Sequence, residues 1–187
     1  AWLNSAKLSD QKWEHILGDV LPKTQSLIAK ILNLKYPEQI AFAPNTHELV
    51  ARLFSCFLGQ DKIKVLTTKS EFHSFRRQLN RLKEYSNLEI VIIDNEAESF
   101  EDDFLKNIDD ELDLIFLSQV FFNSGKIIST EFIQKIIDHK RKETIFCLDA
   151  YHGFCAIPTD LQKFESEIYY LAGGYKYAQA GEGMCFL

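Results

Sequence analysis

Several features that would quickly assign a function are missing from this sequence of 187 residues. It has no Gly-x-Gly-x-x-Gly and no Gly-x4-Gly-Lys-Ser/Thr pattern, which disfavours a nucleotide-binding domain built on those phosphate loops. No apolar run approaches the roughly 20 residues of a membrane span, and no signal peptide opens the chain. Basic residues are outnumbered, 21 against 27 acidic ones, so a nucleic-acid or anionic-membrane surface is disfavoured. These absences predict a cytoplasmic protein.

The four cysteines lack the spacing of a metal site or a redox pair. They are Cys56, Cys147, Cys155 and Cys185, and three of them lie in or beside apolar runs. The sequence therefore predicts buried free thiols and no metal.

Short apolar runs alternate with amphipathic stretches along most of the chain. Because the strand-like runs are continuously apolar, both of their faces are expected to be covered, which is typical of a mostly parallel sheet in an α/β three-layer sandwich. We expect strands at 39–43, 63–67, 90–93, 114–117, 144–148, 168–172 and 184–187. We expect helices at both sides of a break at Pro22, after a cap at Asn45 and Thr46, around 75–82 and 100–108, after a cap at Thr130, and in a short polar segment that follows Asp149.

The pattern changes once along the chain. Residues 1–38 read as an N-terminal helical segment and residues 39–187 as one α/β domain. The chain opens without methionine and stops on an apolar strand, so we expect a fragment of a longer protein.

Polar residues follow each predicted strand, where ligands bind in sheets of this kind. Because the carboxyl ends of parallel strands meet at one edge, these clusters are expected to converge. They are Asn45, Thr46 and His47; Phe72, His73 and Ser74; Ser118 and Gln119; Asp149 and His152; and Lys176.

Lys176 lies in a glycine-rich loop between two apolar runs, with a tyrosine on each side. Apolar and aromatic neighbours would desolvate its amine and lower the pKa, which favours a nucleophilic, Schiff-base lysine. The alternative is an ordinary lysine in a tyrosine-rich turn.

Asp149 ends an apolar strand 27 residues before Lys176. Such a buried carboxylate needs a cationic partner, and a protonated ring nitrogen would serve. The two residues form the pair that a pyridoxal phosphate enzyme requires. The alternative for Asp149 is a cap on the following turn. Asn45, Thr46 and His47 could likewise be a phosphate site or a simple helix cap.

Four motifs together resemble the class V aminotransferase family of fold-type I pyridoxal 5′-phosphate enzymes. They are Asn45-Thr-His-Glu48, Ser118-Gln-Val-Phe-Phe-Asn-Ser-Gly125, Asp149-Ala-Tyr-His152 and Tyr175-Lys176-Tyr177 with Gly181 and Gly183. The pattern Asp-x-x-His with Tyr-Lys-Tyr is most similar to the kynureninase-like branch. The resemblance runs from about residue 39 to residue 187 and covers only the large cofactor-binding domain, so the C-terminal small domain is expected to be missing.

The resemblance implies a role for each catalytic candidate. Lys176 would form the Schiff base and shuttle the proton at the substrate α-carbon, and Asp149 would pair with the pyridine nitrogen. His152 would brace Asp149 or the ring hydroxyl.

It also implies the cofactor-binding residues. Thr46, His47 and Tyr175 would bind the phosphate. Phe72 would stack on the ring with Ser74 close by, and Gln119 would lie near the ring substituents.

Three residues depart from the family pattern. Tyr151 stands where a small residue usually lies under the ring, Phe121 where many members have a polar residue facing the substrate, and Phe75 where a polar residue often aids cofactor binding.

The resemblance predicts a pyridoxal phosphate enzyme acting on an amino acid, foremost an aminotransferase, in a homodimer with its active site at the subunit interface. A kynureninase-like hydrolase and a cysteine desulfurase-like lyase stay open within the same chemistry. A catalytically silent phosphate- or cofactor-binding domain is the alternative of another class.

Overall fold

The computed structural model describes residues 2–187, which fall into two compact units. Unit 1 consists of the chain up to residue 41 together with residues 158–165, and unit 2 consists of residues 42–157 and 166–187. The segment 158–165 thus groups with the N-terminal helices, although the sequence pattern placed it in the α/β domain. The domain assignment itself stays a prediction.

Unit 1 is mainly helical. Its elements are α1 (Trp2–Lys7), α2 (Gln11–His15), the π-helical η1 (Ile16–Val20), α3 (Leu21–Leu32) and the 3-10 turn η2 (Pro37–Gln39). The expected break at Pro22 is wrong, because helix runs without interruption from Gln11 to Leu32. Pro22 lies in the first turn of α3 directly after the π-helical segment, where its missing N–H is tolerated.

Backbone hydrogen bonds tie residues 158–165 to the end of α3. Leu161 N–H donates to the Leu32 carbonyl at 2.9 Å. Glu165 Oε1 accepts hydrogen bonds from the backbone amides of Lys35 and Tyr36, at 2.6 and 2.9 Å. These contacts join two segments of unit 1 that lie more than 120 residues apart in the sequence.

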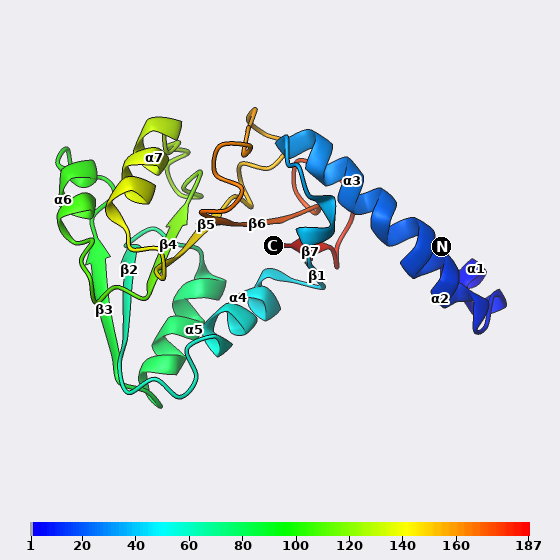
Figure 1. The fold of residues 1–187 in the computed structure, drawn as a ribbon, viewed down its shortest axis with the longest axis horizontal. Helices are drawn as coiled ribbons and strands as arrows, with labels where there is room; N and C mark the ends of the chain where they lie inside the picture. Colours follow the sequence, from blue (N-terminus) through cyan, green and yellow to red (C-terminus); the bar gives the residue numbers. More distant parts are fainter. Residues whose placement is uncertain (1) are drawn as a thin grey trace. The chain divides into compact units, whose positions relative to one another are not determined.

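Unit 2 is built on a seven-stranded sheet in the order β1-β7-β6-β5-β4-β2-β3 (Figure 1). The strands are β1 (Phe42–Ala43), β2 (Ile63–Thr68), β3 (Leu88–Ile93), β4 (Leu114–Ser118), β5 (Ile145–Asp149), β6 (Tyr169–Gly173) and β7 (Cys185–Phe186). The pairs from β3 through β6 are all parallel, and β7 runs antiparallel to β6 and to β1. The predicted mostly parallel sheet is confirmed.

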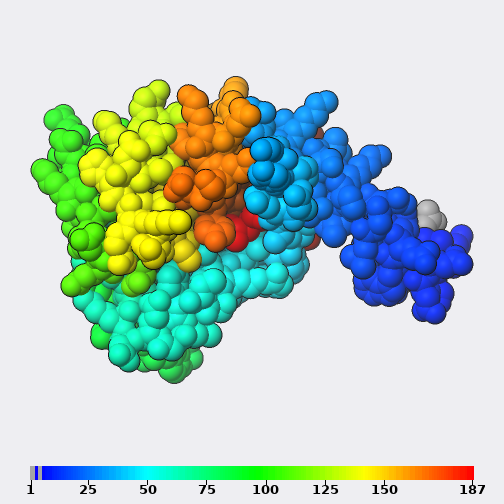
Figure 2. Space-filling model, viewed as in Figure 1, coloured from blue at the N-terminus to red at the C-terminus, as the bar shows by residue number. Residues whose placement is uncertain are grey.

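Helices cover both faces of this sheet. The helices α4 (Thr46–Ser55) and α5 (His73–Lys83) lie on one face, and α6 (Phe100–Lys106) and α7 (Thr130–His139) lie on the other (Figure 1). In the space-filling view, α4 and α5 are cyan to teal and α7 is yellow (Figure 2). The predicted three-layer α/β arrangement is therefore confirmed for unit 2.

The core lies where the central strands meet the α4 and α5 layer. Every residue of β2 and β4 is buried. The ring of Phe75 on α5 stacks on that of Phe116 on β4, with centroids 3.7 Å apart. This stack anchors α5 to the middle of the sheet and gives Phe75 a packing role.

Local details differ from the sequence prediction. Strand β1 is only two residues long because a 3-10 turn occupies residues 37–39. Ser129, and not Thr130, caps α7, since its hydroxyl accepts the Phe132 N–H at 3.1 Å. The short polar helix after Asp149 is absent. The chain forms successive turns there, in which the amides of Gly153 and Phe154 both donate to the Ala150 carbonyl.

All four cysteines are free thiols. Cys147 and Cys185 are buried as expected, whereas Cys56 and Cys155 are exposed, so the prediction of burial is wrong for those two. Cys56 directly follows the last turn of α4 and Cys155 lies in a surface turn. Within residues 2–187, the helices are too short or too polar to cross a membrane.

Candidate active site

A pocket of about 320 Å³ opens at the carboxyl ends of the parallel strands in unit 2. This volume is in the range of small-molecule sites. Most of the polar clusters predicted from the sequence meet in it. The residues that line it are Asn45, Thr46, His47, Phe72, Ser74, Ser118, Phe122, Asp149, Tyr151, His152, Tyr175 and Lys176.

Asp149 supplies a buried carboxylate at the end of β5. Asp149 is 5% exposed, and within the described chain its side-chain carboxylate accepts one hydrogen bond, from the Tyr151 N–H at 3.0 Å. Burial raises the pKa of the Asp149 carboxyl to about 6, although the Tyr151 amide and the charge of Lys176 both favour the carboxylate. A carboxylate with a single hydrogen bond in such a site can accept a cationic partner.

Lys176 lies on the loop that follows β6 and directs its amine into the same pocket. Its Nζ contacts the imidazole of His152 and lies 5.4 Å from the ring centroid of Phe72 and 5.1 Å from that of Tyr151. Burial lowers the pKa of the Lys176 amine, and the charge of Asp149 partly offsets this effect. Burial and the lysine charge also lower the pKa of His152. A larger fraction of the Lys176 amine is therefore neutral than in an exposed lysine.

The loop that carries Lys176 is closed by its own backbone. Gly174 N–H donates to the Met184 carbonyl at 2.9 Å, and Ala180 N–H donates to the Gly174 carbonyl at 2.8 Å. Gly181 and Gly183 adopt φ values of +82° and +80°, which few other residues tolerate. The glycines of the predicted loop thus allow the turn that returns the chain to β7.

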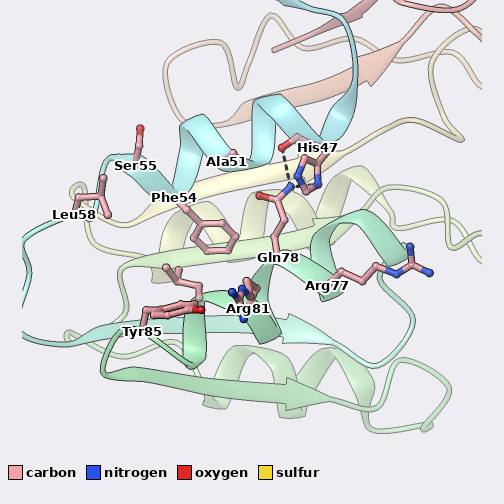
Figure 3. Close-up of a pocket in the computed structure, with 10 residues that line it drawn as sticks. His47, Ala51, Phe54, Ser55, Leu58, Arg77, Gln78, Arg81 and Tyr85 are labelled. Carbon is pink, nitrogen blue, oxygen red and sulfur yellow. Dashed lines mark hydrogen bonds between the residues drawn. The ribbon is translucent and has the colours of Figure 1, made fainter.

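The start of α4 forms another wall of the pocket. The Asn45 side chain accepts the Glu48 N–H at 2.9 Å and caps the helix, as predicted. The amides of the first turn, which include those of Thr46 and His47, have no partner within the helix and can bind an anion. Gln78 of α5 donates to the His47 carbonyl at 2.7 Å and lies 2.9 Å from its Nδ1 (Figure 3). This contact fixes the orientation of the His47 ring.

The remaining predicted ligands are distributed unevenly. Phe72, Ser74 and Tyr175 line the pocket with the residues above. Gln119 does not line it. Its backbone N–H donates to the Asp149 carbonyl at 2.8 Å, and its side-chain oxygen accepts a hydrogen bond from the Tyr170 hydroxyl at 3.3 Å. Gln119 is therefore buried at the ends of the strands.

Phe122, to which the sequence analysis gave no role, lines the pocket, whereas its neighbour Phe121 does not. Phe121 is fully buried and packs against Phe100, so the expectation that it faces the substrate is wrong. Phe122 lines the pocket instead and meets Phe72 edge to face, with centroids 5.4 Å apart. The chain turns at this point, because the Phe121 N–H donates to the Lys126 carbonyl at 3.0 Å and the Phe121 carbonyl accepts the Gly125 N–H at 2.8 Å. Phe122 lies within this turn, and no local sequence pattern indicated it.

A second buried carboxyl, Glu71, stands behind the pocket and was not among the predicted site residues. It accepts hydrogen bonds from the hydroxyls of Thr68 and Ser118, at 2.7 and 2.6 Å, and from the Ser118 amide at 3.2 Å. Burial raises the pKa of Glu71 to about 8, although these hydrogen bonds favour the ionised form, and the Asp149 charge raises it further. In the sequence it directly precedes the predicted site residue Phe72, in the polar segment that follows the strand at 63–67.

A model of the family described as Aminotransferase class-V matches residues 6–187. The chain belongs to the class-V aminotransferase family. The resemblance inferred from the motifs is thereby confirmed at the level of the family. A comparison of this class-V chain with curated proteins gives no match.

Solved structures share the fold of this class-V chain. The apo cysteine desulfurase of Thermococcus onnurineus NA1 has a TM-score of 0.73 at 20% identity, over 89% of this chain and 41% of its own. A C-DES mutant with glycine covalently linked to its PLP cofactor has a TM-score of 0.80 at 14% identity, over 95% and 47%. The cysteine desulfurase CsdA of Escherichia coli has 0.73 at 15% identity, over 87% and 41%. The chain spans less than half the length of these proteins, and at such identities the likeness shows the fold.

The buried carboxyl of Glu71 predicts a pH-dependent stability. Its folded-state pKa of about 8 exceeds the ordinary value of 4.5, so folding favours the protonated form and this stabilisation is lost as the pH rises through 8. We expect the free energy of unfolding of the wild type to fall between pH 5 and pH 9. In Glu71→Gln this fall should be smaller by on the order of 3 kcal/mol. Urea unfolding at both pH values measures it.

The exposed Glu98 provides the matched control for this experiment. Glu98→Gln should keep the wild-type pH dependence. An identical pH dependence in the wild type and Glu71→Gln would show that Glu71 does not titrate in this range.

Proposed function

We propose that this chain is the cofactor-binding domain of a pyridoxal phosphate-dependent enzyme that acts on an amino acid, and that the enzyme is an aminotransferase. One observation carries the proposal: the amine of Lys176 and the buried carboxylate of Asp149 line one pocket, and the charge of each affects the other. Family membership supports the same chemistry.

The residues of the pocket fit pyridoxal phosphate. Asp149 offers a buried anion to a protonated ring nitrogen, which would in turn lower the pKa of that carboxyl. The start of α4, with Thr46 and His47, offers amides and a positive helix end to the phosphate. Phe72 presents an aromatic surface beside the amine.

When bound, the cofactor supplies an aldehyde that condenses with amines and a ring that accepts electrons. The chain supplies the other parts. Lys176, as a partly desolvated amine, would bond the aldehyde and carry the proton at the substrate α-carbon. Asp149 would keep the ring nitrogen protonated, and His152 would orient the amine that it contacts.

Sulfur removal from cysteine is the second candidate activity, because two of the solved structures with this fold are cysteine desulfurases. Hydrolysis in the manner of kynureninase is the third, on the motifs Asp149-x-x-His152 and Tyr175-Lys176-Tyr177. The products distinguish the three. Only transamination requires a 2-oxo acid acceptor, only desulfuration releases sulfur from cysteine, and only the hydrolase cleaves a carbon–carbon bond with water.

A homodimer with its active site at the subunit interface is part of the proposal. It is supported by a groove of about 520 Å³ between α4 and α5, which includes Phe54, Leu58 and Tyr85 and reaches His47 of the pocket (Figure 3). Leu58 and Tyr85 are 74% and 70% exposed, an arrangement that a second copy would cover.

Lys176→Ala tests the covalent link to the cofactor. The wild type should turn yellow when incubated with pyridoxal phosphate, and Lys176→Ala should lose the lysine-linked part of the visible absorbance. Borohydride reduction followed by peptide mass analysis should find the cofactor on Lys176. The exposed Lys142 serves as control, since Lys142→Ala should remain yellow. A wild type that stays colourless would refute the proposal.

Asp149→Asn tests the role of the buried carboxylate. The variant should fold and bind the cofactor, but α-proton removal should slow by about a hundredfold or more, because a neutral amide cannot hold the ring nitrogen protonated. Exchange of the substrate α-proton in deuterium oxide, followed by NMR, measures this step. Asp138→Asn on the surface of α7 should exchange at the wild-type rate. Equal rates in all three proteins would remove Asp149 from the active site.

Leu58→Glu tests the dimer. A buried charge in the groove should weaken self-association by about tenfold or more, as measured by analytical ultracentrifugation. The matched control is Ile92→Glu on strand β3, where the side chain is 54% exposed and lies outside the groove. A fully active wild-type monomer would contradict the proposed interface.

A further inference from the structure

Tyr151 places a large aromatic ring in the pocket at the position where the family pattern has a small residue. Its backbone amide donates to the Asp149 carboxylate at 3.0 Å, so the turn that orients the carboxylate also fixes the base of the tyrosine. The side chain is half-buried and lines the pocket together with Phe72 and Lys176. The same residue thus shapes both the carboxylate and the space beside the amine.

Gly173, the last residue of β6, makes room for this ring. A Cβ atom at position 173 would lie 2.4 Å from Tyr151 Cε2 and 2.8 Å from Cζ, which is closer than real Cβ contacts. All the nearest atoms belong to the outer part of the Tyr151 ring, so the clash is relieved only if that ring moves. Gly173 has no positive φ, unlike Gly181 and Gly183, so its backbone conformation does not require glycine. The need for glycine is therefore one of space.

Two aromatic rings from different elements border the Lys176 amine. Phe72 precedes α5 and Tyr151 follows β5, and their centroids lie 5.4 and 5.1 Å from the same nitrogen atom. A flat ring held at this nitrogen would have both aromatic side chains within reach. Aromatic surfaces at these positions can each contact such a ring.

The phenol end of Tyr151 reaches toward the start of α4. Cys185 Sγ lies 3.9 Å from the Tyr151 hydroxyl and 3.9 Å from the Thr46 hydroxyl. Burial raises the pKa of Tyr151 to about 12, and the neighbouring Cys185 adds to the effect, so the phenol stays neutral at physiological pH. A neutral phenol therefore adds no net charge beside Lys176 and Asp149.

We propose that Tyr151 is a cofactor-positioning residue whose ring forms the second aromatic wall of the ring slot, with Phe72 as the first and with Gly173 providing its space. The inference rests on the proposed function, because the slot is meaningful only if the pocket takes pyridoxal phosphate. In this inference the large side chain of Tyr151, where the family pattern has a small residue, is accommodated by the missing side chain of Gly173.

A double-mutant cycle on the full chain tests the pair. Lys176→Ala is the background, so that the measured affinity for pyridoxal phosphate is non-covalent, and fluorescence titration gives the dissociation constant. Tyr151→Ala and Gly173→Ala should each weaken binding, by about 3- to 10-fold, because one removes the wall and the other displaces it. The double variant should bind like Tyr151→Ala alone, since the added methyl group then has no ring to meet.

Two further variants serve as matched controls. Tyr151→Phe keeps the ring and should bind within about twofold of the background. Gly18→Ala adds a methyl group where nothing lies within 4 Å, and should leave binding unchanged. Circular dichroism and thermal unfolding show whether each variant is folded, and Tyr151→Phe preserves the test if Tyr151→Ala does not fold.

The outcomes separate the two levels of the proposal. Tighter binding by Tyr151→Ala would mean that the tyrosine fills the place of the cofactor, and unchanged binding would mean that it makes no contact; either result overturns the wall. Weaker binding by Tyr151→Phe than by Tyr151→Ala would overturn it as well. If the protein with Lys176 intact binds no pyridoxal phosphate, the proposed function and this inference fall together.

Discussion

The whole site depends on one electrostatic constraint, the burial of the Asp149 carboxylate at the end of a central parallel strand. In the sheet register Ser118, Asp149 and Leu171 lie side by side on β4, β5 and β6, and Asp149 is only 5% exposed. Only one hydrogen bond within the described chain reaches it. A buried anion in these surroundings is stable only with a nearby cation or a proton. The lysine loop after β6 brings the cation to the same pocket.

A second buried carboxyl, Glu71, affects the protonation of the groups in this region. Glu71 contacts the end of β4 through Ser118. The charge of Asp149 raises the pKa of Glu71, and both charges raise the pKa of Cys147. Because both carboxyls are desolvated, a proton is most easily kept on Glu71, which has the higher pKa. Asp149 is then the anion that faces the pocket. Burial is the main cause of both raised pKa values, and the charge of Lys176 acts against it at Asp149.

The sequence predicted those features that depend on local pattern, and missed those that depend on side-chain direction. Apolar strands and the polar residues behind them located the parallel sheet and most of the pocket, because strand ends of one direction must share an edge. The helix cap at Asn45 followed from its hydrogen-bonding chemistry. The motifs could not show which of Gln119, Phe121 and Phe122 faces the pocket, since this depends on the turn that begins at Phe121. The continuous helix through Pro22 depended on a π-helical segment that no local pattern indicated.

The two hydrogen bonds from Gln78 to His47 have a mechanical consequence. Phe72 is the N-cap of the helix that carries Gln78, and His47 lies in the first turn of α4. These bonds therefore couple an aromatic wall to the helix start beside the pocket. The stack of Phe75 on Phe116 holds the same helix against the sheet. Phe72 and His47 are thereby parts of one stiff frame. A change in the distance between Phe72 and His47 would require both hydrogen bonds of Gln78 to break.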